Sequence, residues 1–267
     1  ALAIQLLVGR LGSWAADKSP DFAKSLFETW QPPLLLAAVL GVVWLVFALI
    51  YAGLEKRAAR VYAVKKAGAT DKLVWKDLVR FDLGYWWVVG LCVAFYSTIF
   101  PFRTFANLYF IEAKGLAPED AGNLKSILPL LSMIGMPLFG LLVDKIGKRA
   151  LLMAAGSALL VPPFFLLAFS SAPPTLLMAM LGLAFALVPA VLWPAVTYLV
   201  PEQRLGSAYA LMTFCQQVGW AGMSWGLGLL KDASGASAAH PAGWAPVMVA
   251  LGALASVGFV FSFLLWK

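Results

Sequence analysis

The sequence predicts an all-α protein that crosses a membrane several times. Of its 267 residues, 62% are apolar, against roughly 45–50% in an average soluble domain. A spanning helix needs about 20 apolar residues, so a charge-free stretch of that length holds one span and the longest holds two. The stretches without Asp, Glu, Lys or Arg are 29–54, 83–102, 126–143, 150–201, 205–230 and 233–266.

Seven complete spans are expected, with an eighth already under way at residue 1. That first segment lacks an initiating Met and a basic region, so we expect it to be the later part of a helix. Prolines mark several starts, as in Pro32-Pro33, Pro118 and Pro173-Pro174, because Pro is favoured in the first helical turn. The expected spans are a partial helix at 1–14, then 31–54, 83–110, 119–143, 150–170, 174–199, 206–230 and 243–266.

The composition argues against several classes of protein. A soluble enzyme, a disulfide-stapled secreted domain and a nucleic-acid partner are all unexpected for so apolar a chain, despite its net charge of +7. Cys92 and Cys215 both fall inside expected spans, without a CxxC pattern or a neighbouring His, which favours a packing role. No metal site and no cofactor are expected.

The basic residues are distributed unevenly between the two sides of the membrane. If the spans alternate, thirteen Lys and Arg fall on one side and four on the other. Because positive charge is retained in the cytoplasm, the 55–82 connector and the C-terminus are expected there. The connector mixes acids with its bases, which favours a solvated linker over a lipid-binding patch.

A loop after the fourth span carries the most specific pattern. It reads Gly-Leu-Leu-Val-Asp-Lys-Ile-Gly-Lys-Arg over 140–149, which resembles the GxLxDxxGxR loop of the major facilitator superfamily. That family has twelve helices in two halves, and the resemblance implies a partial facilitator fold covering about helices 5–12. It also implies that the loop helps to close the cytoplasmic side, through Gly140, Asp144, Gly147, Lys148 and Arg149.

A second loop, Pro201 to Ala208, is similar to the E-x-R-x-G-x-A turn between the fourth and fifth helices of a facilitator half, and carries Glu202 and Arg204. Both loops stand where the family would place them if a six-helix half begins at 83. The implied organisation is 1–54 as the last helices of the N-terminal half, 55–82 as the cytoplasmic connector and 83–267 as the C-terminal half. The rest of the N-terminal half is expected as a partner from the same protein.

Further segments resemble the lysosomal dipeptide transporter branch of that superfamily. The resemblance lies in Phe-Pro-Phe at 100–102, Leu-Trp-Pro at 192–194, Val-Pro-Glu at 200–202, Leu-Gly-Ser-Ala-Tyr at 205–209 and Gly-Arg-Leu-Gly-Ser at 9–13. It implies a secondary transporter that moves a small zwitterion or anion, dipeptides above all, by alternating access. Asn107 stands where that branch would have a lysine, and the composition favours a prokaryotic inner (cytoplasmic) membrane.

The span 174–199 is a candidate wall of the transport path. Pro189 and Pro194 remove backbone donors and free the carbonyls of Phe185 and Ala190, so we expect an interrupted helix that bends at Trp193. Transporters bind substrate at such interruptions near the bilayer midplane. Trp193 either lines the cavity or packs against the bend.

Two further spans carry polar faces. Thr213, Gln217 and Trp220 lie on one side of 206–230, either for interhelical hydrogen bonds or for substrate contact. Gly222 and Gly226 form a small-xxx-small pair, typical of helix packing. On 83–110 the residues that share a face are Tyr96, Arg103 and Asn107, where Arg103 either faces the path or snorkels to the interface.

Arg10 is the most informative single residue. A charge at the centre of a spanning helix costs about 2.5–3.5 kcal/mol, so a partner is expected. A guanidinium can hold a carboxylate through two parallel hydrogen bonds, which suits the C-terminus of a peptide. The alternative partner is an acid in the missing N-terminal half.

Three functions compete at this stage. The sequence favours a transporter for small molecules or dipeptides. An intramembrane enzyme is disfavoured, because the only histidine, His240, lies in a loop and, beyond the first turn of 119–143, no Asp or Glu lies inside the spans from 83 onward. A non-transporting facilitator-like receptor or assembly subunit stays open, since fold does not fix function, as does a facilitator for another small organic anion.

Overall fold

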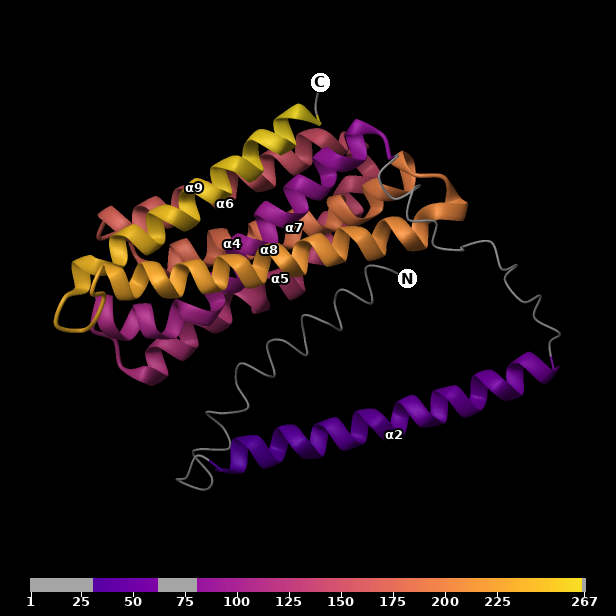
Figure 1. Cartoon of the computed structure of the whole chain (residues 1–267), viewed down its shortest axis with the longest axis horizontal. Coiled ribbons are helices and arrows are strands. Elements are labelled where there is room, and N and C mark those ends of the chain that lie inside the picture. Colours follow the sequence, from indigo (N-terminus) through magenta and orange to yellow (C-terminus); the bar gives the residue numbers. More distant parts are fainter. Residues whose placement is uncertain (1–30, 62–80, 266–267) are drawn as a thin grey trace. The chain divides into compact units, whose positions relative to one another are not determined.

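The computed structural model describes residues 31–61 and 81–265, and every long element in them is an α-helix (Figure 1). The residues separate into two compact units, which we describe one at a time. The predicted all-α class is confirmed. Arg10 and Lys267 lie outside the described residues.

The first unit contributes a single described helix, α2 (Gln31–Val61). Its central side chains are exposed, including Trp44 at 78% and Phe47 at 66%. Such a surface suits contact with lipid or with other helices rather than with water. The helix continues seven residues past the predicted end at Leu54, because Glu55 to Val61 contains good helix formers and neither Gly nor Pro.

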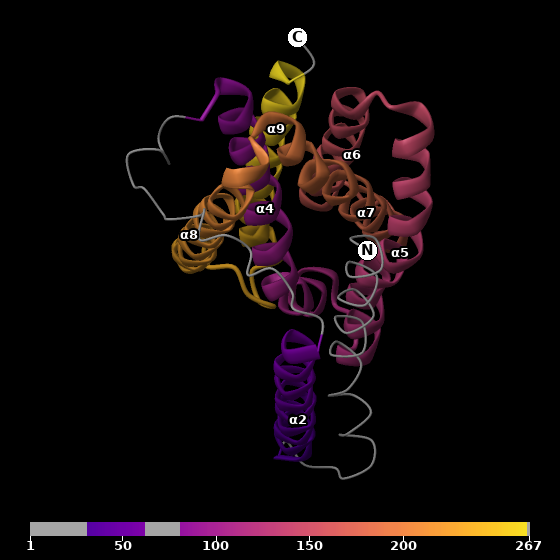
Figure 2. The same ribbon diagram turned by 90° about the vertical axis from the view of Figure 1, so that its right-hand side faces the viewer.

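The second unit is a bundle of six long helices (Figure 2). α4 packs against both α8 and α9, α7 packs against α5 and α6, and α6 also packs against α9. The bundle therefore consists of two groups of three helices joined along α6 and α9. The bounds are α4 (Leu83–Lys114), α5 (Pro118–Ile146), α6 (Arg149–Phe169), α7 (Pro174–Leu199), α8 (Leu205–Ala233) and α9 (Trp244–Leu264).

Local chemistry explains where these helices begin and end. The Asp82 side chain accepts a hydrogen bond from the backbone N–H of Gly84 at 3.1 Å, which caps α4. Gly115 takes a left-handed φ of 67° and ends the same helix, four residues beyond the predicted end. α5 starts on Pro118 with Glu119 and Asp120 in its first turn, as predicted, so acidic charge meets the helix dipole.

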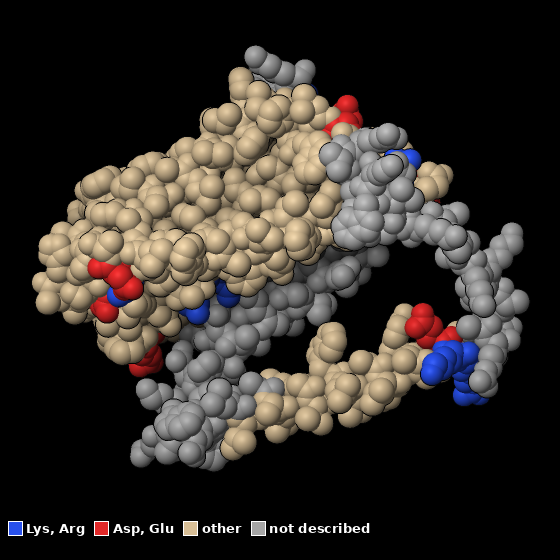
Figure 3. Space-filling model, in the orientation of Figure 1, with Lys and Arg blue, Asp and Glu red and all other residues tan. Residues whose placement is uncertain are grey.

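Six of the seven long helices in the described ranges are apolar enough to span a bilayer. The exception is α8, which has the length for a span but carries two glutamines and several glycines and serines. The predicted span 206–230 is thus a helix with the length of a span and, in its most apolar stretch, a lower mean hydropathy than the other six. Figure 3 shows the body of the bundle as mostly uncharged, with sparse red and blue atoms on this face.

Candidate functional site: an aromatic cluster between α4, α7 and α8

Seven aromatic side chains meet where α4, α7 and α8 face one another. Two hydrogen bonds tie them together: Trp193 donates from Nε1 to the Tyr96 hydroxyl at 2.9 Å, and Tyr209 donates its hydroxyl to the Trp193 carbonyl at 2.9 Å. Each bond joins two helices, so three helices are linked through Trp193. This aromatic cluster consists of Phe95, Tyr96 and Phe100 on α4, Phe185 and Trp193 on α7, and Tyr209 and Trp220 on α8.

Ring contacts run through the whole cluster. Phe100 stacks on Trp220 with centroids 4.6 Å apart and on Tyr96 at 5.5 Å, and Tyr209 stacks on Trp193 at 5.9 Å. Phe185 meets Phe100 edge-on at 6.0 Å. Such pairs stabilise by about 0.5–1.5 kcal/mol beyond burial, so the cluster forms a preorganised apolar wall.

The helix periods explain why these rings converge. Tyr96 and Phe100 are four residues apart and therefore share one face of α4. Phe185 and Trp193 are eight residues apart, about two turns, and share one face of α7. Tyr96 and Phe185 are buried, whereas Phe100, Trp193, Tyr209 and Trp220 keep partial exposure, which leaves ring surface available for a ligand.

The expectation of an interrupted helix at Trp193 is wrong. α7 runs as one helix from Pro174 to Leu199, through both Pro189 and Pro194. A spanning helix tolerates proline because neighbouring groups compensate for the lost donor. The Thr197 hydroxyl donates to the Pro194 carbonyl at 2.8 Å, a local bond just after the second proline.

The structure brings together only some of the residues singled out from the sequence. Tyr96 and Trp193 are in direct contact, and Trp220 joins them through Phe100. Arg103 is half-buried further along α4, whereas Gln217 is exposed on α8. Arg10 belongs to the part of the chain that the structure does not describe.

Tyr209 is the main residue that the sequence reasoning missed. It stood at the end of the quoted Leu-Gly-Ser-Ala-Tyr segment, four residues before Thr213 on the same face of α8. The helical spacing that selected Thr213, Gln217 and Trp220 therefore also reaches Tyr209. The same helical spacing, continued toward the start of the helix, therefore predicts Tyr209 on this face.

Two hydrogen bonds between polar groups join α4 to α8 beside the cluster. Cys92 donates from Sγ to Oε1 of Gln216 at 3.5 Å, and the buried Tyr85 hydroxyl donates to the Ala208 carbonyl at 2.8 Å. The amide that bonds across helices is thus Gln216, the neighbour of the predicted Gln217. Residue spacing shows which side chains share a face of a helix, but it does not show which face packs against a neighbouring helix.

The close approach of these two helices occurs at Gly219 rather than at the predicted glycine pair. A Cβ on Gly219 would lie 2.6 Å from Cγ1 of Val93 and 2.7 Å from Oγ of Ser97. Among the described residues, nothing lies within 4 Å of a Cβ on Gly222 or Gly226. Within the described bundle this pair therefore meets no other helix, and its packing stays a prediction for the rest of the protein.

The end of the bundle that holds both motif loops is exposed and carries charge. Gly147 ends α5 with φ 69°, and its N–H donates to the Val143 carbonyl at 2.9 Å. Asp144 and Lys148 are exposed, as are Glu202 and Arg204 in the short helix η1 (Glu202–Arg204). A Cβ on Gly140 meets no described atom within 4 Å, so no helix of the described part approaches it closely.

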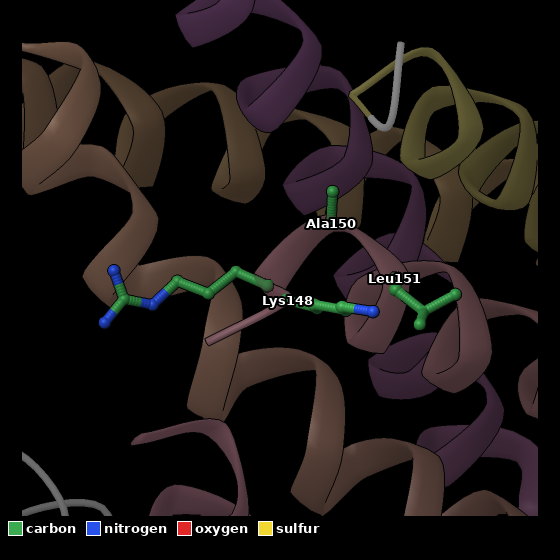
Figure 4. A pocket seen from close by; sticks show the side chains of 4 residues that line it. Lys148, Ala150 and Leu151 are labelled. Atoms are coloured by element: carbon green, nitrogen blue, oxygen red, sulfur yellow. The ribbon is translucent and has the colours of Figure 1, made fainter. Parts of the chain in front are cut away.

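One cation–π contact fixes the start of α6 in this region. The Arg149 guanidinium carbon lies 4.1 Å from the ring centroid of Tyr198, near the end of α7. Beside it is an open hollow of about 360 Å³ lined by Lys148, Arg149, Ala150 and Leu151 (Figure 4). The hollow is a surface feature of the loop between α5 and α6, away from the aromatic cluster.

The opposite end is held by a second set of contacts. Trp244 donates from Nε1 to Oε2 of Glu112 at 3.1 Å, and the Tyr109 hydroxyl donates to the Leu167 carbonyl at 2.7 Å. Lys114 lies over the Tyr109 ring at 5.9 Å and Lys231 over the Trp244 ring at 5.7 Å. These contacts join α4, α6, α8 and α9, so this end of the bundle is tied together.

Within the described ranges, no three His, Cys, Asp or Glu side chains gather where they could hold a metal ion.

Comparison with protein families assigns this architecture. The family model described as Major Facilitator Superfamily matches residues 3–224. The chain belongs to this superfamily. It is accordingly a multi-pass membrane protein of the facilitator fold, and the predicted family is confirmed.

Several proteins are similar to this chain in sequence, some of them over most of its length. It is 32% identical to "Lysosomal dipeptide transporter MFSD1" of Homo sapiens over 87% of the chain and 52% of that protein, and 30% identical to the Gallus gallus protein of that name over 87% and 54%. It is 30% identical to "Alpha-ketoglutarate permease" of Escherichia coli over 48% of the chain and 28% of that protein. The chain spans about half the length of the dipeptide transporters that it matches.

In a facilitator of this superfamily, substrate binds near the bilayer midplane between two repeats. Tyr96 and Phe185 lie in the middle of α4 and α7, whereas Trp193 lies six residues before Leu199, the last residue of α7. The aromatic cluster therefore extends from the middle of α4 and α7 toward the end of α7 that leads into η1.

Proposed function

We propose that the protein is a secondary transporter that moves a small zwitterionic or anionic solute, most specifically a dipeptide, by alternating access. The observation that supports this is the hydrogen bond from Trp193 to Tyr96 within a partly exposed aromatic wall between α4, α7 and α8. The names of the relatives at 30–32% identity support the dipeptide assignment. We propose transport rather than catalysis for the same reasons.

In the proposed site, a charged residue binds the carboxylate of the substrate and aromatic residues contact its side chain. Arg10 holds the substrate carboxylate through two parallel hydrogen bonds, while Trp193 and Tyr96 shape the space for the side chain. Arg103 and Gln217 contribute polar contacts from α4 and α8. The gate at the charged end consists of Gly140, Asp144, Gly147, Lys148, Arg149, Glu202 and Arg204.

We also propose an organisation and an orientation. Residues 83–267 are the C-terminal half, 55–82 the connector and 1–54 the last helices of the N-terminal half, with the C-terminus in the cytoplasm. A prokaryotic inner membrane rests on composition alone, whereas the animal relatives are named as lysosomal.

Uptake by the full-length protein in proteoliposomes tests the function. We expect saturable uptake of a dipeptide, and weaker uptake of the same dipeptide with an amidated C-terminus. Arg10→Ala weakens dipeptide binding at least about thirtyfold, the loss expected when one partner of a desolvated charge pair is removed. Arg10→Lys rescues only part of it, because an ammonium cannot form the bidentate pair.

Amidation gives the decisive comparison for Arg10. If Arg10 holds the carboxylate, amidation has little further effect in Arg10→Ala. Equal losses from amidation in wild type and variant would show that Arg10 does not bind this group.

A second candidate is transport of another small organic anion, favoured by the similarity to the α-ketoglutarate permease. The same liposomes decide between the two: uptake of α-ketoglutarate without uptake of dipeptide would replace the first proposal. Uptake of neither would favour a non-transporting receptor or assembly subunit.

A further inference from the structure

Trp193 is held from both sides by tyrosines of neighbouring helices. Its indole N–H donates to Tyr96 on α4, and its own carbonyl accepts from the Tyr209 hydroxyl on α8, both at 2.9 Å. The Tyr209 ring also stacks on the indole, with centroids 5.9 Å apart and planes 30° apart. Tyr209 therefore constrains both the backbone and the ring of Trp193.

The backbone around Trp193 needs this support. Pro194 has no N–H, so the carbonyl of Ala190 loses its partner in the helix. A helix with a missing bond bends more readily at that point. The bond from Tyr209 is one turn along, at the residue that precedes the proline, and fixes the segment against α8.

Tyr209 also lies close to the turn that carries the second motif. The short helix η1 (Glu202–Arg204) leads directly into α8 at Leu205, and Tyr209 follows four residues later. A movement of that turn is transmitted through about one helical turn of α8 to the Tyr209 side chain. From Tyr209 the movement reaches Trp193 through the hydrogen bond and the stacked rings.

We propose that Tyr209 is a positioning residue that couples the turn between α7 and α8 to the orientation of the Trp193 indole. This role acts through Trp193 and is separate from any contact of the Tyr209 ring with the solute. Opening or closing at Glu202–Arg204 shifts Tyr209, which releases or restores the indole orientation that suits the solute. This rests on the proposed function for its effect on transport, but the contact can be tested without any substrate.

Tyr209→Phe is the informative variant, because it keeps the stacked ring and removes only the hydroxyl. The matched control is Tyr85→Phe, since Tyr85 donates to the Ala208 carbonyl of the same helix at 2.8 Å without touching Trp193. Both variants lose one tyrosine-to-carbonyl bond between the same region of α8 and a neighbour. A purely structural effect would be similar in the two.

The first measurement uses 19F NMR of the full-length protein labelled with 5-fluorotryptophan. The Trp193 resonance is assigned from its absence in Trp193→Phe. We expect it to shift or broaden in Tyr209→Phe and to stay in place in Tyr85→Phe. An unchanged Trp193 resonance in Tyr209→Phe overturns the proposal, whatever the protein transports.

The second measurement is the kinetics of dipeptide uptake. Tyr209→Phe should lower kcat/KM roughly fivefold, the size of one neutral hydrogen bond, with Tyr85→Phe within about twofold of wild type. On a Trp193→Phe background the same change should cost nothing further, because the two residues act as one unit. Equal losses in both backgrounds overturn the coupling, whereas a wild type that takes up no dipeptide contradicts only the proposed substrate and leaves the NMR result to decide.

Discussion

At the residue scale, glycines show most clearly what a sequence pattern predicts and what it leaves open. Gly147 was identified from the motif, and its left-handed φ of 69° gives a physical reason for glycine there. Gly140 belongs to the same motif, yet the described residues leave open space around it. A motif thus marks positions without stating which physical demand each one meets.

Gly147→Ala should destabilise the protein by about 1–2 kcal/mol, because a Cβ is unfavourable in the left-handed region. Gly140→Ala is the matched control and should be nearly neutral, since its Cβ meets nothing within 4 Å among the described residues. Denaturation of the detergent-solubilised protein, followed by circular dichroism, measures both. If Gly140→Ala proved the more damaging, the motif glycine would be packed against a part of the protein outside the described bundle.

At the element scale, the sequence predicted the existence and order of the helices and missed how their faces are used. Charge-free length locates a span because lipid excludes charge, so α4 to α9 were all expected. Their ends depend on local caps. Gly115, for example, ends α4 about one turn beyond the predicted end. Interhelical contacts depend on the rotation of each helix, which explains why Gln216 and Gly219 were missed in favour of Gln217 and Gly222.

Gly219→Ala should separate α4 from α8 and destabilise the bundle by about 1–3 kcal/mol, the usual cost of overpacking. The added methyl would lie 2.6 Å from Val93 and 2.7 Å from Ser97. Gly222→Ala, three residues further along the same helix, should be neutral or slightly stabilising because alanine is the better helix former. Thermal unfolding of the two variants compares them directly, and equal midpoints would show that α4 and α8 adapt to the extra methyl.

Asp144 offers a test of the element that carries the first motif. Because it is exposed near the end of α5, we expect Asp144→Asn to alter contacts that differ between two conformations rather than contacts to substrate. The free energy that couples such a residue to the balance between two conformations is roughly 1–3 kcal/mol. Spin labels at Arg57 and Gln203, both exposed, should therefore show a changed distance distribution.

Asp232→Asn is the control for that measurement. It makes the same substitution at an exposed residue near the C-terminal end of α8. The distribution of distances between the two spin labels should stay as in wild type. Identical distributions in all three proteins, together with full transport by Asp144→Asn, would remove Asp144 from the gate.

At the scale of the whole molecule, the sequence predicted the family correctly because the motifs combine residue type with position in the order of helices. The aromatic cluster could be predicted only in part. Tyr96 and Trp193 are ninety-seven residues apart in the chain, and no period within one helix relates them. Their contact follows from how α4 and α7 pack, which is a property of the assembled bundle.

Orientation in the membrane is the last property that belongs to the whole molecule. The excess of Lys and Arg on one side predicts that the turn at Glu202–Arg204 faces the cytoplasm and that the loop between α8 and α9 faces the opposite compartment. Cysteines at Gln203 and Ala239 report on this, because both positions are exposed, whereas Ala236 in the same loop is buried. A Cys215→Ala background removes the partly exposed native thiol, and Cys92 is buried.

A membrane-impermeant maleimide applied to intact cells should modify Ala239→Cys and spare Gln203→Cys until the cells are permeabilised. The physical reason is that the labelling reagent cannot cross the bilayer, so the side of each loop decides its reaction. The reverse pattern, with Gln203→Cys modified in intact cells, would invert the topology. It would then place the motif loops, and the turn coupled to Trp193, on the outer side of the membrane.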